Sequence, residues 1–230
     1  MDTASGRAVI FDVDGTLVDT NYLHVVAWRR VFLDHDEPGI TSARIHRLVG
    51  MGTDEFLEAL CGRPRPELKA ERARHFAALK SEIRAFPRAG DLLRALRDRG
   101  ARVVLATSAE KSDLEALLAA IDADDAIDAV TSAGEVEAAK PAPDVFSAAL
   151  AEAGTAPQAA VAVGDTVWDV QAASRAGLRC VAVTSGGISR AELEDAGAVA
   201  VYDDVAALLD GLDDSPLLGT STASASRRTE

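Results

Sequence analysis

The sequence predicts an α/β fold with a parallel sheet and an inserted all-helical domain, and two observations lead to this expectation. After residue 88, short apolar runs alternate with helical patterns, and strands alternating with helices form parallel sheets with right-handed crossovers. Residues 7–13 have the pattern of one more strand of that sheet, yet residues 20–86 contain no strand pattern. The 230-residue chain is 48% hydrophobic, which suffices for a core and a small second domain.

The predicted strands are short apolar runs that stop near polar or turn-forming residues. The first run includes Val9, Ile10 and Phe11 and leads directly into an acidic residue. Short continuous apolar runs of this kind are typical of strands that are covered on both faces. The further strands of the sheet are expected at residues 102–108, 126–133, 160–165, 179–185 and 198–204.

Helical spacing of apolar residues predicts helices between these strands. In the second half of the chain they are expected at residues 89–99, 110–121, 143–153, 167–176 and 189–196.

The insertion also reads as helical, with helices expected at about residues 20–36, 41–49, 53–61 and 66–85. An all-helical stretch between the first two strands of a sheet is expected to fold as a separate small domain. Residues 213–230 are rich in Ser, Thr and Ala without apolar periodicity, which predicts a disordered tail. The predicted domains are therefore a core of residues 1–18 and 88–212, a helical domain of residues 19–87, and the tail.

The stretch VIFDVDGTLVDT at residues 9–20 carries the clearest chemical signal. Asp12 and Asp14 follow the first strand two residues apart, which places both side chains on one side of an extended backbone. Two carboxylates this close repel each other unless a proton or a cation joins them, and Mg²⁺ prefers oxygen ligands. An acidic surface turn has a similar composition, but buried strands rarely lead into paired acids without a partner for the charge.

Three later segments repeat the design of an apolar run followed by polar residues. RVVLATS at residues 102–108 ends in hydroxyls, AAKPAPD at 138–144 holds a lysine before a predicted helix, and AVAVGDTVWD at 160–169 holds two acids. The carboxyl ends of strands are where open α/β folds bind ligands. The candidate residues in these segments are Thr107, Ser108, Lys140, Asp165 and Asp169.

In this order, the motifs resemble the four motifs of the haloacid dehalogenase superfamily of phosphohydrolases, over residues 8 to about 205. The resemblance implies a Rossmann-like parallel sheet core. It also implies that the helical insertion is the cap of the helical-cap subclass (subclass I), which closes over the active site. Within the superfamily the chain is similar to phosphoglycolate phosphatases and beta-phosphoglucomutase-like proteins. Superfamily dehalogenases lack the second acid, so Asp14 argues against that activity.

The resemblance assigns roles to the two acids after the first strand. Asp12 is the expected nucleophile, because a carboxylate can attack phosphorus and form an aspartyl-phosphate. Asp14 is the expected acid and base, which protonates the leaving alkoxide and then takes a proton from the attacking water. This role requires Asp14 to be protonated when substrate binds.

The resemblance also implies Mg²⁺ as the cofactor. The expected ligands are Asp12, the backbone carbonyl of Asp14, and Asp165. Asp169 matches the last acid of the final motif and is expected to bind the metal through water or to orient its ligands.

The phosphate is expected to lie among hydrogen-bond donors and one cation. Thr107 would donate from the tip of the second strand, and backbone amides near Ser108 would cradle the phosphoryl oxygens. Lys140 would supply a positive charge. A lone lysine is most often solvated, but the position of Lys140 between an apolar strand and a proline matches the third motif of the family.

The cap holds three candidates for substrate specificity. His24 lies ten residues after Asp14, where related enzymes carry a similar histidine, although a lone histidine on an amphipathic helix is usually structural. VGMGTDEF at residues 49–56 resembles the cap loop that reaches into the active site, and its Gly50 and Thr53 are expected near substrate. Beta-phosphoglucomutases have an arginine where Thr53 stands.

The predicted function is a Mg²⁺-dependent phosphatase that hydrolyses a small organic phosphate monoester. A phosphosugar mutase would use the same aspartyl-phosphate and is the first alternative. A non-catalytic phosphate-binding protein is a second alternative, which the presence of all motif residues disfavours.

Composition limits the partners. The net charge of −13 and a pI near 4.7 argue against nucleic acid, which attracts basic surfaces, but not against a small phosphate ester. No signal peptide and no apolar run of the ~18 residues needed to cross a bilayer is found, so a cytoplasmic location and no membrane partner are expected. The protein is expected to be a monomer or a weak dimer.

Overall fold

The sheet of the molecule matches the predicted α/β class. The computed structural model describes residues 6–109, 111–132 and 138–219. Within them, six parallel strands form one sheet in the order β3-β2-β1-β4-β5-β6, so the predicted fold class is confirmed. The strands are β1 (Ala8–Phe11), β2 (Arg102–Ala106), β3 (Ala129–Thr131), β4 (Ala160–Gly164), β5 (Arg179–Val183) and β6 (Ala200–Tyr202).

The first strand lies at the centre of the sheet because it is apolar throughout. All four of its residues are fully buried. Val9 pairs with Val103 of β2 on one side and with Val161 of β4 on the other. A strand covered on both faces needs this unbroken apolar run, whereas a half-exposed strand would alternate polar and apolar residues.

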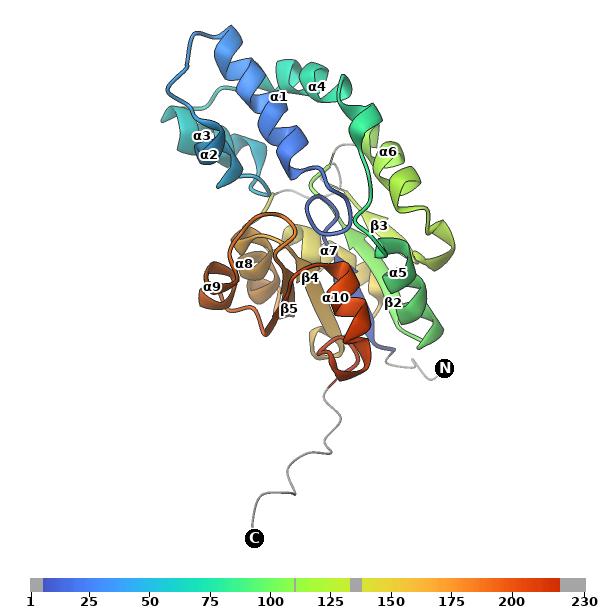
Figure 1. Ribbon diagram of the computed structural model, residues 1–230. Coiled ribbons are helices and arrows are strands. Elements are labelled where there is room, and N and C mark those ends of the chain that lie inside the picture. Colours follow the sequence, from blue (N-terminus) through green and yellow to red (C-terminus); the bar gives the residue numbers. More distant parts are fainter. Residues whose placement is uncertain (1–5, 110, 133–137, 220–230) are drawn as a thin grey trace.

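Helices cover both faces of the sheet, so the core domain has three layers (Figure 1). Val9 and Phe11 belong to one apolar cluster, and Ala8 and Ile10 belong to a second, as the alternation of side chains along a strand requires. The first cluster includes residues of α5 (Ala89–Asp98), α6 (Lys111–Ile121) and α10 (Val205–Asp210), and the second includes residues of α7 (Asp144–Ala153), α8 (Val167–Arg175) and α9 (Arg190–Asp195).

The inserted segment forms a helical cap with its own core. Figure 1 shows its four helices gathered at one end of the sheet. Trp28 packs against Phe56 with ring centroids 4.8 Å apart, and against Phe32 at 5.9 Å. These rings belong to an apolar cluster separate from the two that flank the sheet. The cap helices are α1 (Asn21–Asp34), α2 (Ser42–His46), α3 (Thr53–Cys61) and α4 (Leu68–Ala77).

The predicted helix over residues 66–85 is wrong in its second half. Helix α4 ends at Ala77, and a short 3₁₀ turn follows at Lys80–Glu82. Leu79 and Ile83 are buried in the core of the sheet domain and not in the core of the cap. The chain must therefore turn back toward the sheet here, and a continuing helix would carry these side chains away from it.

The two segments that join cap and core lie side by side. The backbone amide of Asp19 donates to the carbonyl of Arg84 at 2.9 Å, and the amide of Phe86 donates to the carbonyl of Leu17 at the same distance. The predicted boundary at residues 18–19 falls within the first of these segments, and the predicted boundary at residues 87–88 lies just after the second.

The predicted disorder of residues 213–230 is wrong for its first part. Leu212–Asp214 form a 3₁₀ turn, and Leu217 is fully buried in the same apolar cluster as β1. Leu218 packs against the same cluster, so two apolar residues anchor a segment whose composition is otherwise polar. Residues 220–230 lie outside the described part of the chain. Helix α10, which the sequence analysis did not predict, packs just before this turn.

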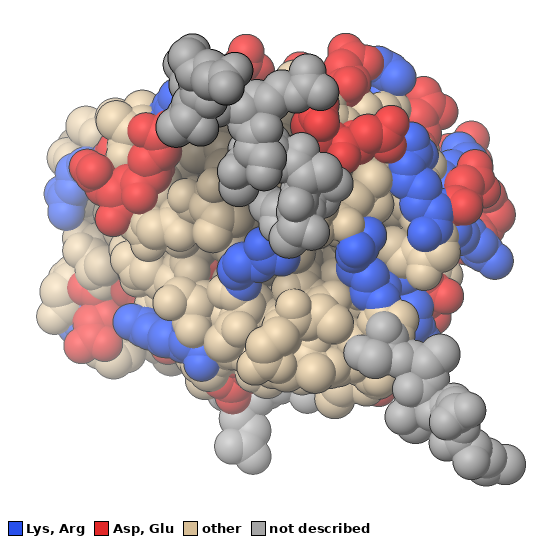
Figure 2. Space-filling model, turned by 90° about the horizontal axis from the view of Figure 1, so that it is seen from below, with Lys and Arg blue, Asp and Glu red and all other residues tan. Residues whose placement is uncertain are grey.

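On the face opposite the cap, the described residues carry charges of both signs. In Figure 2 the Lys and Arg side chains on that face are interspersed with acidic and uncharged residues. Within the described residues, no helix has the length and hydropathy to cross a bilayer.

Candidate active site

The candidate site lies where the strand order reverses, between β1 and β4. Asp12 follows β1, and Asp165 follows β4 directly. The amide of Asp12 donates to the carbonyl of Val163 at 2.8 Å, which extends the pairing of the two strands to the acid itself. Open α/β sheets bind ligands in the crevice at such a reversal. Asp12 and Asp165, which are 153 residues apart in sequence, therefore share one site.

Three buried acids lie close together at this point. Carboxylate oxygens of Asp12, Asp165 and Asp169 lie within 4.8 Å of one another. Burial raises the pKa of Asp165 well above its ordinary value, and the neighbouring acids raise it further. Burial likewise raises the pKa of Asp12 to about 7, although Lys140 lowers it. A divalent cation would relieve this crowding of like charge, and an all-oxygen donor set suits Mg²⁺.

The Asp165 carboxylate is held from both sides. The Thr16 hydroxyl donates to Oδ1 at 3.0 Å, and the Asn21 amide donates to Oδ2 at 2.7 Å. Gly15 has a φ of +80°, and a Cβ atom at this position would lie 2.3 Å from Asp165 Oδ2. The turn after Asp14 therefore requires glycine for its backbone conformation and for the space beside the carboxylate.

Lys140 is a buried cation in contact with two of the acids. Its ammonium group makes an ion pair with Asp12, and it lies 2.7 Å from Asp169 Oδ1, while the side chain is only 1% exposed. Burial lowers the pKa of Lys140, but the charges of Asp12 and Asp169 outweigh burial and raise it above its ordinary value. The amine is therefore protonated and directed at the carboxylate of the predicted nucleophile.

Asp169 orients Lys140 and also begins helix α8. Its Oδ2 accepts a hydrogen bond from the Thr166 amide at 3.0 Å, and its own amide donates to the Thr166 hydroxyl oxygen at 3.3 Å, so the two residues form a capping box. Its Oδ1 faces Lys140. The second acid of the final motif thus joins the helix start to the buried lysine.

Asp14 points toward the cap. Its Oδ1 lies 3.1 Å from His24 Nε2 and accepts a 2.6 Å hydrogen bond from Thr20, and its Oδ2 accepts from the Thr107 hydroxyl at 3.4 Å. Burial raises the pKa of Asp14, but His24, Thr20 and the charge of Arg72 lower it more, to about 2. Asp14 is therefore ionised at rest, so the expected acid role requires the arriving phosphate to raise its pKa.

The tautomer of His24 follows from its contact with Arg72. The Arg72 guanidinium lies 2.6 Å from Nδ1, and a guanidinium can only donate. Burial and the charge of Arg72 lower the pKa of His24, which favours the neutral ring. Nδ1 must then accept and Nε2 must carry the proton, so His24 donates to Asp14. Phe76 stacks on the ring with centroids 4.3 Å apart and holds its plane.

A cavity of about 100 Å³ joins the cap to these residues. Asp12, Asp14 and Ser108 line it from the core. Thr107 is fully buried behind it, and its hydroxyl accepts from the Ala109 amide at 3.0 Å. The structure thus brings the predicted cap residues to the predicted acids. The cap side of the cavity includes His24, Gly50, Thr53, Trp28, Met51 and Arg72.

Comparison with known proteins agrees with this geometry. The family model of haloacid dehalogenase-like hydrolases matches residues 7–177, which is most of the chain. The chain belongs to the haloacid dehalogenase-like hydrolases. The predicted family and the prediction that the chain is an enzyme are confirmed.

Two similar proteins match this hydrolase over nearly its whole length. Protein CbbY of Cereibacter sphaeroides is 34% identical over 90% of this chain and 96% of the relative. A phosphoglycolate phosphatase of Rhodospirillum rubrum is 33% identical over 90% of each chain.

Two solved structures are similar to the hydrolase. A hydrolase from Pseudomonas syringae has a TM-score of 0.85 at 34% identity, over 90% of this chain and 98% of the other. A variant of CbbY from Rhodobacter sphaeroides in complex with xylulose-(1,5)bisphosphate has a TM-score of 0.71 at 30% identity, over 88% and 96% of the two chains.

The hydrolase also has site residues that the sequence analysis missed. Thr16 and Thr20 lie within the stretch at residues 9–20 and Asn21 follows it directly, and their position shortly after paired acids is the signal that could have found them. Arg72 lies on α4, among other charged residues of the cap, and carries no local signal. Only the packing of α4 against α1 brings it to His24.

We expect Arg72→Met to slow turnover by roughly tenfold, because losing a hydrogen bond to a charged group costs about 1.5–3 kcal/mol. The substitution removes the donor that fixes the proton of His24 on Nε2, while the long apolar side chain still covers Phe76. Steady-state kinetics with p-nitrophenyl phosphate and Mg²⁺ measure the effect. Turnover equal to the wild type would show that the tautomer of His24 does not affect the reaction.

Proposed function

We propose that this hydrolase is a Mg²⁺-dependent phosphatase that hydrolyses a small organic phosphate monoester through an aspartyl-phosphate on Asp12. The observation that carries the proposal is the contact between Asp12 and the buried Lys140, within a cluster of three acids at the reversal of the strand order. Attack on a phosphate anion by a carboxylate requires positive charge beside both groups. Here the carboxylate lies next to one cation and next to a site for a second. The name of one similar protein, a phosphoglycolate phosphatase, supports this class of substrate.

In the first step Asp12 attacks phosphorus. The ammonium of Lys140 offsets the repulsion between the carboxylate and the phosphoryl oxygens, and Thr107 together with the amides near Ser108 receives those oxygens. The new bond joins an Asp12 oxygen to phosphorus, while the bond from phosphorus to the ester oxygen breaks. Asp14, once protonated, gives its proton to that oxygen, so the leaving group departs as an alcohol.

In the second step water attacks the phosphorus of the aspartyl-phosphate. Asp14, now ionised, takes a proton from the water, and His24 holds its carboxylate in place. Phosphate leaves and Asp12 is restored as a carboxylate. Asp12, Asp165 and the carbonyl of Asp14 are the proposed metal ligands, and Mg²⁺ when bound would add positive charge beside the phosphoryl group.

The substrate is proposed to be small. The cavity between the acids and the cap has a volume of about 100 Å³. Arg72 is the cationic side chain of its lining, and it lies 3.8 Å from Asp113, which partly offsets its charge. A short leaving group therefore fits better than a second phosphate in this position of the cap.

Phosphatase and mutase differ in the acceptor of the phosphoryl group. Thr53 lines the cavity and carries no charge to hold a sugar phosphate, which favours water as the acceptor. Release of inorganic phosphate, measured with and without a sugar bisphosphate activator, separates the two. Release of inorganic phosphate that requires neither the bisphosphate activator nor a sugar substrate supports the phosphatase. Formation of an isomerised sugar phosphate, without net release of inorganic phosphate, supports the mutase.

We expect removal of divalent metal by EDTA to abolish hydrolysis of p-nitrophenyl phosphate and Mg²⁺ to restore it. Because Mg²⁺ binds acids that are crowded only in the folded chain, it should also raise the melting temperature, by an amount that grows with Mg²⁺ concentration. A thermal melt with matched NaCl controls for ionic strength. Full activity in EDTA would show that the acid cluster is not a catalytic metal site.

A further inference from the structure

Asn21, the first residue of cap helix α1, lies against the acid cluster of the core. Its side chain is buried, with 3% of the residue exposed. Its Nδ2 atom donates to Asp165 Oδ2 at 2.7 Å and to the carbonyl of Gly186 at 3.2 Å. The carbonyl of Gly186 can only accept a hydrogen bond, so it determines which end of the amide faces these two partners. Asn21 therefore gives Asp165 a donor that belongs to the cap.

Two glycines leave the space for this contact. A Cβ atom at Gly15 would lie 2.3 Å from Asn21 Nδ2, and a Cβ atom at Gly186 would lie 1.6 Å from Asp165 Oδ2. Any larger residue at either position would displace the amide or the carboxylate. The backbone on two sides thus confines the pair to one arrangement.

The oxygen end of the Asn21 amide also lies in the interior. Asn21 Oδ1 is buried and has no hydrogen-bond partner within the described residues. A buried carbonyl oxygen normally accepts at least one hydrogen bond. Beside a cluster of acids that fits a hydrated cation such as Mg²⁺, a water molecule of the site is a suitable donor.

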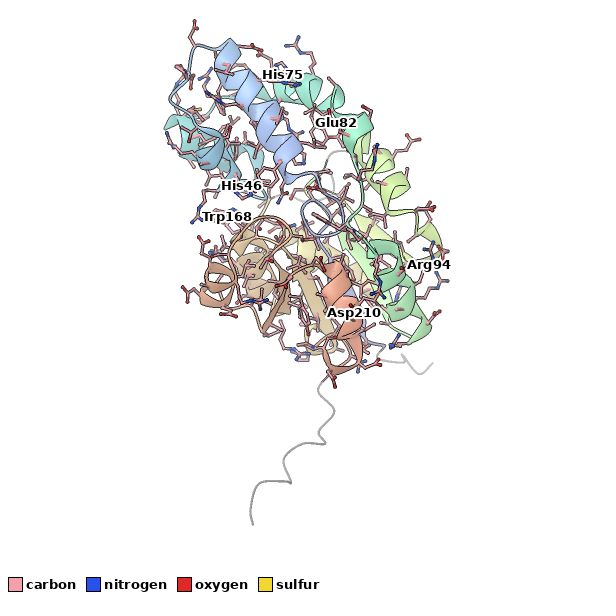
Figure 3. All side chains as sticks on the ribbon, viewed as in Figure 1. His46, His75, Glu82, Arg94, Trp168 and Asp210 are labelled. Atoms are coloured by element: carbon pink, nitrogen blue, oxygen red, sulfur yellow. The ribbon has the colours of Figure 1, made fainter. Side chains whose placement is uncertain are left out.

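The Gly186 carbonyl also contacts a second residue of the cap. His46 Nε2 of helix α2 lies 2.8 Å from this oxygen, and Figure 3 shows His46 on the side of the cap that faces the core. The next residue, Arg47, makes a 2.5 Å ion pair with Glu192 of α9. Two cap helices therefore meet the core on the loop after β5, and one of them continues to Asp165 through Asn21.

We propose that Asn21 is a positioning residue for the cation site: it sets the orientation of Asp165 and thereby makes metal affinity depend on the docked cap. The inference rests on the proposed function, because it takes the acid cluster as a Mg²⁺ site. When this donor is lost, Asp165 keeps only the hydrogen bond from Thr16 to its Oδ1 atom and gains rotational freedom, so ordering it around the cation costs more entropy. Residues that hold metal ligands in place commonly contribute a factor of about 10–100 to metal affinity.

The test is calorimetric titration of metal-free protein with MgCl₂ alone, without substrate. Asn21→Ala removes the amide, and Asn21→Leu removes it while keeping the volume of the side chain. We expect both variants to bind Mg²⁺ about tenfold more weakly than the wild type. Thr41→Ala is the control, because it removes the side-chain cap of α2, which accepts from Arg44, without touching the acids. Its Mg²⁺ affinity should equal that of the wild type.

The outcomes separate this inference from the proposed function. Wild-type affinity in both Asn21 variants, or loss in Ala but not in Leu, overturns the inference, since the second pattern indicates packing alone. An equal loss in Thr41→Ala also overturns it, because any loosening of the cap would then suffice. If the wild type binds no Mg²⁺ and releases no phosphate, the proposed function itself is wrong. Thermal melts in EDTA verify that each variant is folded.

Discussion

Asp12→Asn is expected to lower turnover of a phosphate ester by a factor of at least about 1,000, because loss of a nucleophile removes the covalent route altogether. The substitution keeps the shape of the side chain but replaces the attacking oxygen with a neutral amide. Lys140 retains its contact with Asp169, so the fold of the site has a remaining charge partner. Phosphate release from p-nitrophenyl phosphate with saturating Mg²⁺ gives the ratio of kcat/KM values.

Asp125→Asn is the matched control for this variant. Asp125 is an exposed acid of the core domain that pairs with Arg94 at 2.7 Å, so the same chemical change occurs outside the cavity that Asp12 lines. Its kinetics should equal those of the wild type. If Asp12→Asn keeps more than about a tenth of wild-type turnover, another residue is the nucleophile.

Lys140→Met is expected to destabilise the protein by about 3–5 kcal/mol, because removal of one partner leaves buried charges uncompensated. The carboxylates of Asp12 and Asp169 would then lie in the core without their shared cation. Met keeps most of the volume of the lysine and its packing near Phe146. Urea unfolding in EDTA measures the loss, and turnover should fall with it because Lys140 also faces the phosphate.

Lys69→Met makes the same substitution in an exposed ion pair. The side chains of Lys69 and Asp54 are 41% and 67% exposed, and such pairs contribute less than about 1 kcal/mol. Mg²⁺ should recover part of the stability lost in Lys140→Met, since it supplies positive charge to the same acids. Equal unfolding free energies for the two variants would mean that the buried acids do not need the lysine.

Patterns that depend on nearby residues were sufficient to predict the sheet and the motif residues. Each of the six strands lies inside its predicted range, because an apolar run of five or six residues followed by polar residues is a local signal. The motif acids and Lys140 converge for the same reason: each stands at the carboxyl end of a parallel strand, just before a helix or in the first turn of a helix, and parallel strands bring these ends to one edge.

Features that depend on packing between distant segments could not be predicted from the sequence. Arg72 reaches His24 only because α4 crosses α1, and Asn21 reaches Asp165 only because the cap docks on the core. The early end of α4 and the burial of Leu217 could not be predicted for the same reason. In each case the apolar surface that buries the side chains belongs to the sheet domain. The ionised state of Asp14 likewise depends on His24, which lies across the cavity.

The most direct test of the central claim is to find the phosphoryl group on the enzyme. Protein mixed with a ³²P-labelled phosphate ester and Mg²⁺ is quenched in acid during turnover, digested, and mapped by mass spectrometry. We predict label on the peptide that contains Asp12, absent when EDTA replaces Mg²⁺ and absent from Asp12→Asn. Label on a different residue, or turnover with no labelled peptide at any quench time, would contradict an aspartyl-phosphate on Asp12.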